Sequence, residues 1–202
     1  MLKELFEGHF YRTFPRVTNR VLNLRERVCS GAFSILDEKA CRDCRYLCDS
    51  NPADREQMKV VSLEPVYVIS LDEVFSYVKE DVGELCDYML EGNDIVVIVE
   101  MTCSTSNYVA EKRRKARRQL YNTLTNLMTS PVVKEHIERL AEHYVVFSWK
   151  ETFNSNVDAD YVEKNMVDMT VMADEVYSPD NESNFDFGFK MKEIRYPFAL
   201  AV

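Results

Sequence analysis

One carboxylate, Glu100, lies inside an otherwise apolar segment. Residues Asp94 to Thr102 read D-I-V-V-I-V-E-M-T, and five consecutive β-branched apolar residues indicate a strand that is buried on both faces. A charge in such a strand is costly unless a cation compensates it, so Glu100 is a candidate ligand for Mg²⁺ or Mn²⁺. Asp94 is a second candidate on the same face, and a polar residue at the strand entry is its alternative interpretation. The two lie roughly 20 Å apart on an extended strand and cannot share one ion.

A strongly basic helix follows this strand. Its six cations fall within seven positions: Lys112, Arg113, Arg114, Lys115, Arg117 and Arg118. The apolar spacing predicts a helix from Tyr108 to about Met128, packed through Ala116, Leu120, Leu124 and Leu127.

The helical repeat separates the cations into two groups. At about 100° per residue, Lys112, Arg113 and Gln119 face the end of the acidic strand, whereas Arg114, Lys115 and Arg118 point outward. The cations that do not face the strand are expected to remain available to bind the phosphates of a nucleic acid. A carboxylate near lysine and glutamine, backed by cations, suits metal-assisted phosphodiester hydrolysis. A solvated helix face is the other interpretation of the basic run.

The order of strands and helices expected from the sequence predicts an α/β fold, with a central mixed β-sheet flanked by helices. Strands are expected at 60–71, 94–102, 144–149 and 185–192, and helices at 17–28, 73–90 (capped by Asp72), 108–128 and 131–142. We expect a single domain over 1–202. It consists of a helical, Cys-rich part (1–59), an α/β core (60–150), and an acidic segment with a terminal strand (151–202).

Four cysteines form a cluster near the N-terminus. Cys29, Cys41, Cys44 and Cys48 are spaced C-x11-C-x2-C-x3-C, which matches no standard zinc finger. Thiolates grouped in this way can hold Zn²⁺ or an iron–sulfur cluster, form disulfides, or remain unbonded. The sequence leaves these alternatives open.

Composition excludes several classes of protein. A net charge of -9 and a pI of about 5.0 exclude a uniformly basic nucleic-acid coat. No apolar run is long enough to cross a bilayer and no secretory signal is visible, so we expect an intracellular, cytoplasmic protein without membrane contact. None of the five glycines forms a phosphate-binding loop, and the three histidines lack metal-ligand spacing.

The order of strand I-V-V-I-V-E-M-T, helix E-K-R-R-K-A-R-R-Q-L and strand Y-V-V-F-S-W resembles the PD-(D/E)XK, restriction-endonuclease-like superfamily. The family's E-x-K half-motif falls on Glu100-Met101-Thr102, with threonine in place of lysine. Some members take the lysine from the next helix, which nominates Lys112 or Lys115, and Gln119 matches a helix glutamine of several branches.

The family's aspartate normally stands on a strand paired with the E-x-K strand, a dozen or more residues upstream. Asp94 is too close to Glu100 for that role. Asp72, at the end of the 66–71 strand, and Glu84, on the expected helix 73–90, are the alternatives.

The resemblance implies a restriction-endonuclease-like core and a Mg²⁺- or Mn²⁺-dependent nuclease. Its expected substrate is DNA, in a branched or Holliday-junction-like structure, and a homodimer is the expected assembly. The degraded motif suggests a protein of an archaeal virus, acting in the host cytoplasm. Two non-enzymatic alternatives stay open. One is a nucleic-acid-binding module, and the other is a protein-interaction domain that uses the acidic 157–182 region and the alternating phenylalanines.

Overall fold

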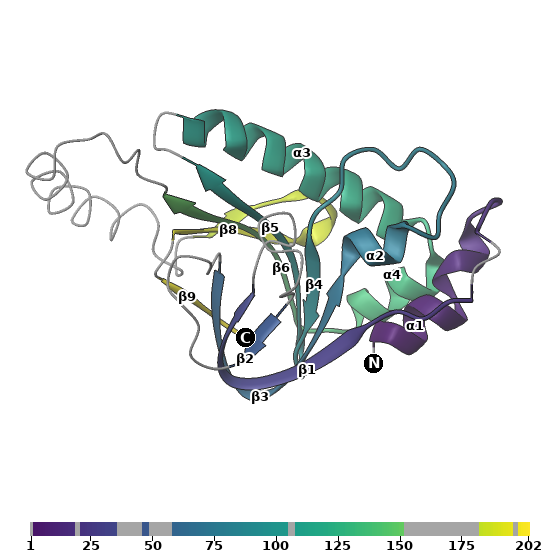
Figure 1. Cartoon of the computed structure of the whole chain (residues 1–202), viewed down its shortest axis with the longest axis horizontal. Coiled ribbons are helices and arrows are strands. Elements are labelled where there is room, and N and C mark those ends of the chain that lie inside the picture. Colours follow the sequence, from purple (N-terminus) through teal and green to yellow (C-terminus); the bar gives the residue numbers. More distant parts are fainter. Residues whose placement is uncertain are drawn as a thin grey trace, which may run out of the picture.

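The computed structural model describes residues 2–18, 21–35, 46–48, 58–104, 108–151, 182–195 and 198–202 (Figure 1). Its strands are β1 (Glu26–Ile35), β2 (Tyr46–Cys48), β3 (Met58–Ser70), β4 (Tyr88–Glu91), β5 (Ile95–Ser104), β6 (Glu142–Glu151), β7 (Glu182–Asn184), β8 (Lys190–Arg195) and β9 (Ala199–Ala201). The helices are α1 (Leu2–Gly8), α2 (Leu71–Phe75), α3 (Val109–Met128) and α4 (Pro131–Glu138), with short 3-10 turns at Phe10–Thr13 and Asp186–Gly188. None of the described helices is long and apolar enough to span a membrane.

The strands form one mixed sheet in the order β2-β1-β3-β4-β5-β6-β8-β7, with β9 alongside the first part of β3. β4 runs antiparallel to both of its neighbours, β3 and β5, whereas β5, β6 and β8 are parallel. Parallel neighbours need a crossover connection, and α3 with α4 provides the one between β5 and β6. The predicted α/β class with a central mixed sheet is therefore confirmed.

The two faces of the sheet are covered differently. On one face, Val96 and Ile98 of β5 join a core that contains residues of all four helices. On the other face, Val97 and Val99 pack in a core built from the strands themselves, including β1 and β9 (Figure 1). β5 is thus buried on both sides, as its β-branched run predicts.

The long strands β1 and β3 contain an irregularity that accommodates their bend. The register shifts between Cys29 and Gly31, and Gly31 has a φ of 75°, which only glycine adopts without strain. Opposite this bulge, Pro65 of β3 has no amide hydrogen to donate. Cys29 is buried on β1, while Cys41, Cys44 and the side chain of Cys48 lie outside the described residues, as does the acidic segment 157–181.

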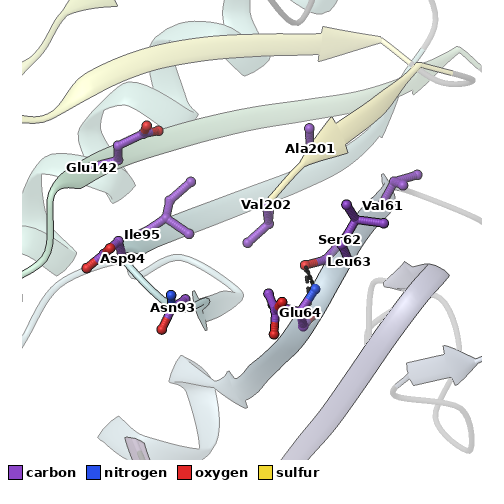
Figure 2. Close-up of a pocket in the computed structure, with 10 residues that line it drawn as sticks. All are labelled: Val61, Ser62, Leu63, Glu64, Asn93, Asp94, Ile95, Glu142, Ala201 and Val202. Atoms are coloured by element: carbon purple, nitrogen blue, oxygen red, sulfur yellow. Dashed lines mark hydrogen bonds between the residues drawn. The ribbon is translucent and has the colours of Figure 1, made fainter.

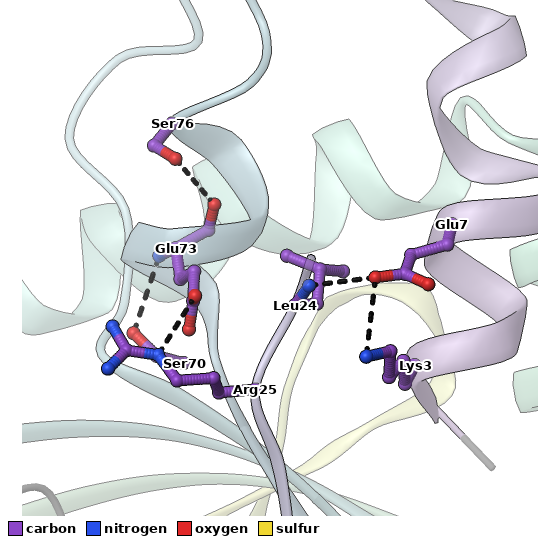
Figure 3. Close-up of polar contacts among 7 residues, drawn as sticks. All are labelled: Lys3, Glu7, Leu24, Arg25, Ser70, Glu73 and Ser76. Atoms are coloured by element: carbon purple, nitrogen blue, oxygen red, sulfur yellow. Dashed lines mark hydrogen bonds and ion pairs between the residues drawn. The ribbon is translucent and has the colours of Figure 1, made fainter. Parts of the chain in front are cut away.

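The helix expected over 73–90 is wrong, and this error matters for function. The helix α2 spans only Leu71–Phe75, and its N-cap is Ser70 rather than Asp72 (Figure 3). After α2 the chain runs in extended and turn conformations along α3. Gly83 there has a φ of 74°, which interrupts any helix, and the chain then enters β4.

The helix expected over 17–28 is also wrong, and the helix expected over 131–142 holds in part. Val17 bridges Val78 instead of starting a helix, and Glu26 already belongs to β1. Leu24 donates its amide hydrogen to Glu7 of α1, and Arg25 pairs with Glu73 at 3.2 Å, so tertiary contacts hold this segment extended (Figure 3). The helix expected over 131–142 ends at Glu138.

The expected strand over 185–192 is divided by a 3-10 turn. β7 precedes the turn and β8 follows it, so the alternation of phenylalanines does not describe one continuous strand. β7 lies at the end of the sheet order, so it forms one edge of the sheet. The helix α3 and the strand β6 agree with their predicted positions.

The hairpin of β7 and β8 gives a pH-dependent contribution to stability. Hydrogen bonds from Lys190 and then from Lys192 and Tyr144 lower the pKa of Glu182 to about 2. Because this folded pKa lies below the ordinary value, the stabilisation is present above about pH 4.5 and is lost as the pH falls toward 2. We expect Glu182→Gln to lower the melting temperature at pH 7 by about 2 °C or less. Thermal melts should show the difference narrowing below pH 4.5, and a constant difference would contradict this assignment.

Candidate functional site

Asp87, which the sequence analysis did not nominate, lies at the end of the paired part of β4 and β5. Asp87 immediately precedes β4, and its amide donates to the carbonyl of Val99 at 3.1 Å. Its Oδ2 atom accepts a hydrogen bond of 2.7 Å from the amide of Met101. These two bonds bind Asp87 to the residues on either side of Glu100, so its carboxylate lies beside Glu100 on the neighbouring strand.

Glu100 itself lies under the helical layer. It is 8% exposed, and strand alternation places its side chain on the same face as Val96 and Ile98, which pack against α3. A carboxylate at this depth keeps its charge only when groups of opposite charge or hydrogen-bond donors compensate its desolvation. The structure thus supports the unusual position that the sequence predicts for Glu100.

Several negative charges lie near the buried thiol of Cys86. Burial raises the pKa of Cys86 well above its usual range, and the negative charges of Glu100, Asp87 and Asp72 raise it further. Asp72 is exposed in the first turn of α2, and the adjacent Leu71 amide donates to the carbonyl of Asp87 at 2.9 Å. Three carboxylates, one in α2, one just before β4 and one within β5, therefore act on one buried group.

Side chains of α3 hold the segment that carries Asp87. Gln119, which is 4% exposed, donates from Nε2 to the carbonyl of Leu85 at 2.8 Å. Thr123 Oγ1 accepts from the amide of Cys86 at 2.9 Å. The Oε1 atom of Gln119 is buried and meets no hydrogen-bond donor among the described residues. It can therefore accept a hydrogen bond from a bound ligand or water. Gln119 thus acts first as a positioning residue for Asp87.

The first turns of α3 bring cations over the same level of the sheet. Arg113 Nε lies 2.8 Å from the carboxylate of Glu193 on β8. Glu193 pairs in register with Phe147, which pairs with Glu100, so the three residues form one row across the parallel strands. Lys112 precedes the buried Ala116 by one turn and is half-buried, which places it toward the sheet as expected.

Other cations of α3 are engaged differently from the prediction. Lys115 and Arg118 were expected to remain available for phosphates, but both pair with Glu84, at 3.5 and 2.8 Å. These pairs lower the pKa of Glu84, with the hydrogen bond from Arg118 as the largest cause. Glu84 is exposed and turned to α3, so its nomination as the partner of Glu100 is wrong. Arg114 and Arg117 are exposed on the outer face of α3.

Asp94 belongs to a different site from Glu100. It is exposed before the first residue of β5, beside a cavity of about 490 Å³ whose rim also carries Glu64 and Glu142 (Figure 2). The cavity lies at the first residues of β5, whereas Glu100 is further along the strand, so on an extended strand the two carboxylates remain too far apart to share one ion. Asp94 is therefore corrected to a polar residue at the strand entry.

Asp87 could have been found from a hairpin signal. The stretch Gly92-Asn93 stands between two runs rich in aliphatic residues, and such a pair is typical of a tight turn between antiparallel strands. The amide of Gly92 does bond the carbonyl of Ile95 at 2.9 Å. Reading 88–91 as a strand would have placed Asp87 opposite Glu100.

Comparison with known proteins adds no relative. The chain matches no protein-family model, and searches of curated proteins and of solved structures found no match either.

Proposed function

We propose that this protein is a divalent-metal-dependent nuclease that hydrolyses phosphodiester bonds, with Asp87 and Glu100 as the ligands of Mg²⁺ or Mn²⁺. The observation that carries the proposal is the pair of bonds that ties Asp87 to Val99 and Met101, on either side of Glu100. Two carboxylates are brought together there although they come from different strands.

The donor set at this position fits a hard cation. Within the described ranges, no three His, Cys, Asp or Glu side chains are grouped closely enough to hold a metal ion by themselves. Mg²⁺ is commonly bound through one or two carboxylates, with water and substrate phosphate completing its coordination. A carboxylate pair therefore suits a metal that binds together with a phosphate substrate.

The pairing also supports the resemblance to the PD-(D/E)XK superfamily. The family's aspartate is expected on the strand that pairs with the E-x-K strand, a dozen or more residues upstream. Asp87 meets both conditions, because it stands thirteen positions before Glu100 and at the start of β4, which pairs with β5. Asp87 takes the role for which Asp72 and Glu84 were considered.

Residues of the chain bind the cation, position the backbone and neutralise charge on the phosphate. A bound divalent cation would polarise a phosphoryl oxygen and lower the pKa of an attacking water. Asp87 and Glu100 hold that cation, while Gln119 fixes the backbone before Asp87. Lys112, in place of the missing motif lysine at Thr102, neutralises negative charge that develops on the phosphate.

Cleavage assays test this function directly. We expect the purified chain to cut single-stranded, duplex or branched DNA in the presence of Mg²⁺ or Mn²⁺, and EDTA to stop the reaction. Asp94→Asn is the matched control, because Asp94 is an exposed acid that immediately precedes β5 and lies away from Glu100. The activity of this variant should equal that of the wild type. Binding of DNA without cleavage under every metal would contradict the nuclease and favour a non-enzymatic binding module.

A further inference from the structure

Two large aromatic side chains are exposed side by side on the helical face of the protein. Tyr121 of α3 is 46% exposed and Phe187 of the 3-10 turn is 47% exposed. Their ring centroids lie 6.0 Å apart with an interplanar angle of 36°, so the two rings are tilted rather than stacked flat. Each ring leaves a large part of its surface to solvent.

The backbone presents Phe187 at an energetic cost. Its φ of 60° and ψ of 22° lie in the left-handed region, which residues with a bulky side chain rarely adopt. The surrounding turn holds it there, because the Phe185 amide donates to the carbonyl of Phe189 at 2.8 Å and both of these phenylalanines are buried. Two buried anchors thus fix a turn whose tip exposes an aromatic ring.

Arginines extend this surface along α3. Arg114, Arg117 and Tyr121 are three and four residues apart, so they follow one another along one side of the helix. The guanidinium of Arg117 lies 5.2 Å from the ring centroid of Phe185, which joins the turn to the helix. Both arginines are exposed and can contact anions from solvent.

We propose that Tyr121 and Phe187, together with Arg114 and Arg117, bind an unpaired stretch of a nucleic-acid strand. Aromatic rings stack on bases of any sequence, and neighbouring arginines contact the phosphates between them. A base-paired duplex keeps its bases stacked on each other and cannot use the rings. This inference rests on the proposed nuclease function and specifies its substrate as one with a single-stranded segment.

Binding assays in EDTA test the site without any turnover. Fluorescence anisotropy of a labelled oligothymidine and of a hairpin duplex of equal charge would give both affinities for the full-length chain. We expect Phe187→Ala and Tyr121→Ala each to weaken oligothymidine binding by about ten-fold, and to change duplex binding by less than about two-fold. Leu63→Ala, at an apolar side chain that is 98% exposed and distant on β3, should leave both affinities unchanged.

Variants at Phe187 separate stacking from apolar contact. Phe187→Trp keeps a ring and should retain the affinity for the oligonucleotide, whereas Phe187→Leu keeps apolar volume alone and should lose it as Phe187→Ala does. Melting temperatures check that each variant is folded. A wild-type chain that does not bind the oligonucleotide, variants that bind it as the wild type does, or equal losses for both nucleic acids would overturn the proposal, and would assign the rings to a protein contact. Failure of the nuclease proposal is a separate result, because it would appear as unchanged binding with no cleavage when metal is added.

Discussion

Asp87→Asn is expected to reduce the rate of DNA cleavage by at least ~100-fold, which corresponds to a loss of about 3 kcal/mol of transition-state stabilisation. The substitution removes the charge that binds the cation but preserves the shape of the side chain. Its amide oxygen can still accept the hydrogen bond from Met101, which lies 2.7 Å from Asp87 Oδ2 in the native protein. The fold at the start of β4 should therefore be retained.

The measurement for Asp87→Asn is single-turnover cleavage at saturating Mg²⁺, accompanied by a thermal melt. We expect a melting temperature within about 2 °C of the wild type, because the local hydrogen bonds remain. Asp72→Asn serves as a second comparison, since Asp72 also acts electrostatically on Cys86 but is exposed on α2. Wild-type cleavage by Asp87→Asn would show that Asp87 is not a ligand, whatever its position.

Glu100→Gln should have an equal or larger effect, with cleavage reduced by ~100- to 1,000-fold. Glu100 is buried, so no water-exposed carboxylate can readily replace it, and the neutral amide has little affinity for a hard cation. The double variant with Asp87→Asn should be about as inactive as the worse single variant. Residues that act on one ion are not additive, because loss of either removes the same species.

The double variant distinguishes a shared ion from two independent contributions. If the two losses instead multiply, Asp87 and Glu100 contribute separately and the shared site is excluded. Stability provides the folding control for the Glu100 variant. Glutamine keeps the size and shape of the Glu100 side chain, and burying a neutral amide costs less than burying a carboxylate. The metal-free variant should therefore melt no lower than the metal-free wild type, and added Mg²⁺ should raise the melting temperature of the wild type alone.

The strongest local patterns predicted the central elements correctly. The run Ile95 to Val99 has no helical alternative of similar quality, since β-branched residues disfavour helices and no turn residue interrupts them. The apolar stripe of α3 repeats over twenty residues, so its burial could be read directly, including Ala116 and Leu124. The depth of Glu100 followed from these two elements without knowledge of the remaining fold.

The carboxylate partner was missed because the helical spacing of the residues before it outweighed the hairpin signal at Gly92-Asn93. Val74, Tyr77, Val78, Leu85 and Met89 have a spacing that favours a helix locally, whereas the protein uses them in a short helix, an extended segment and a strand. Hydrogen bonds from Gln119 and Thr123 stabilise the extended path from the other side of the molecule. Interactions of this range leave no periodic signal in the sequence.

The ion pairs on α3 show the same limit. Helical geometry correctly places Arg114, Lys115 and Arg118 outside, but exposure does not reveal which cations already have a partner. Glu84 lies more than thirty residues away in sequence and neutralises two of them. Among the exposed cations of α3, Arg114 and Arg117 consequently remain for a phosphate backbone, next to the exposed rings.

Titration of the metal-free protein with Mn²⁺, followed by electron paramagnetic resonance, tests whether Asp87 and Glu100 hold one cation between them. We expect one bound ion per chain in the wild type and in Asp94→Asn, with an affinity that falls at least ~10-fold in both Asp87→Asn and Glu100→Gln. Undiminished Mn²⁺ affinity in either of these two variants would contradict a cation held jointly by Asp87 and Glu100, and with it the proposed nuclease site.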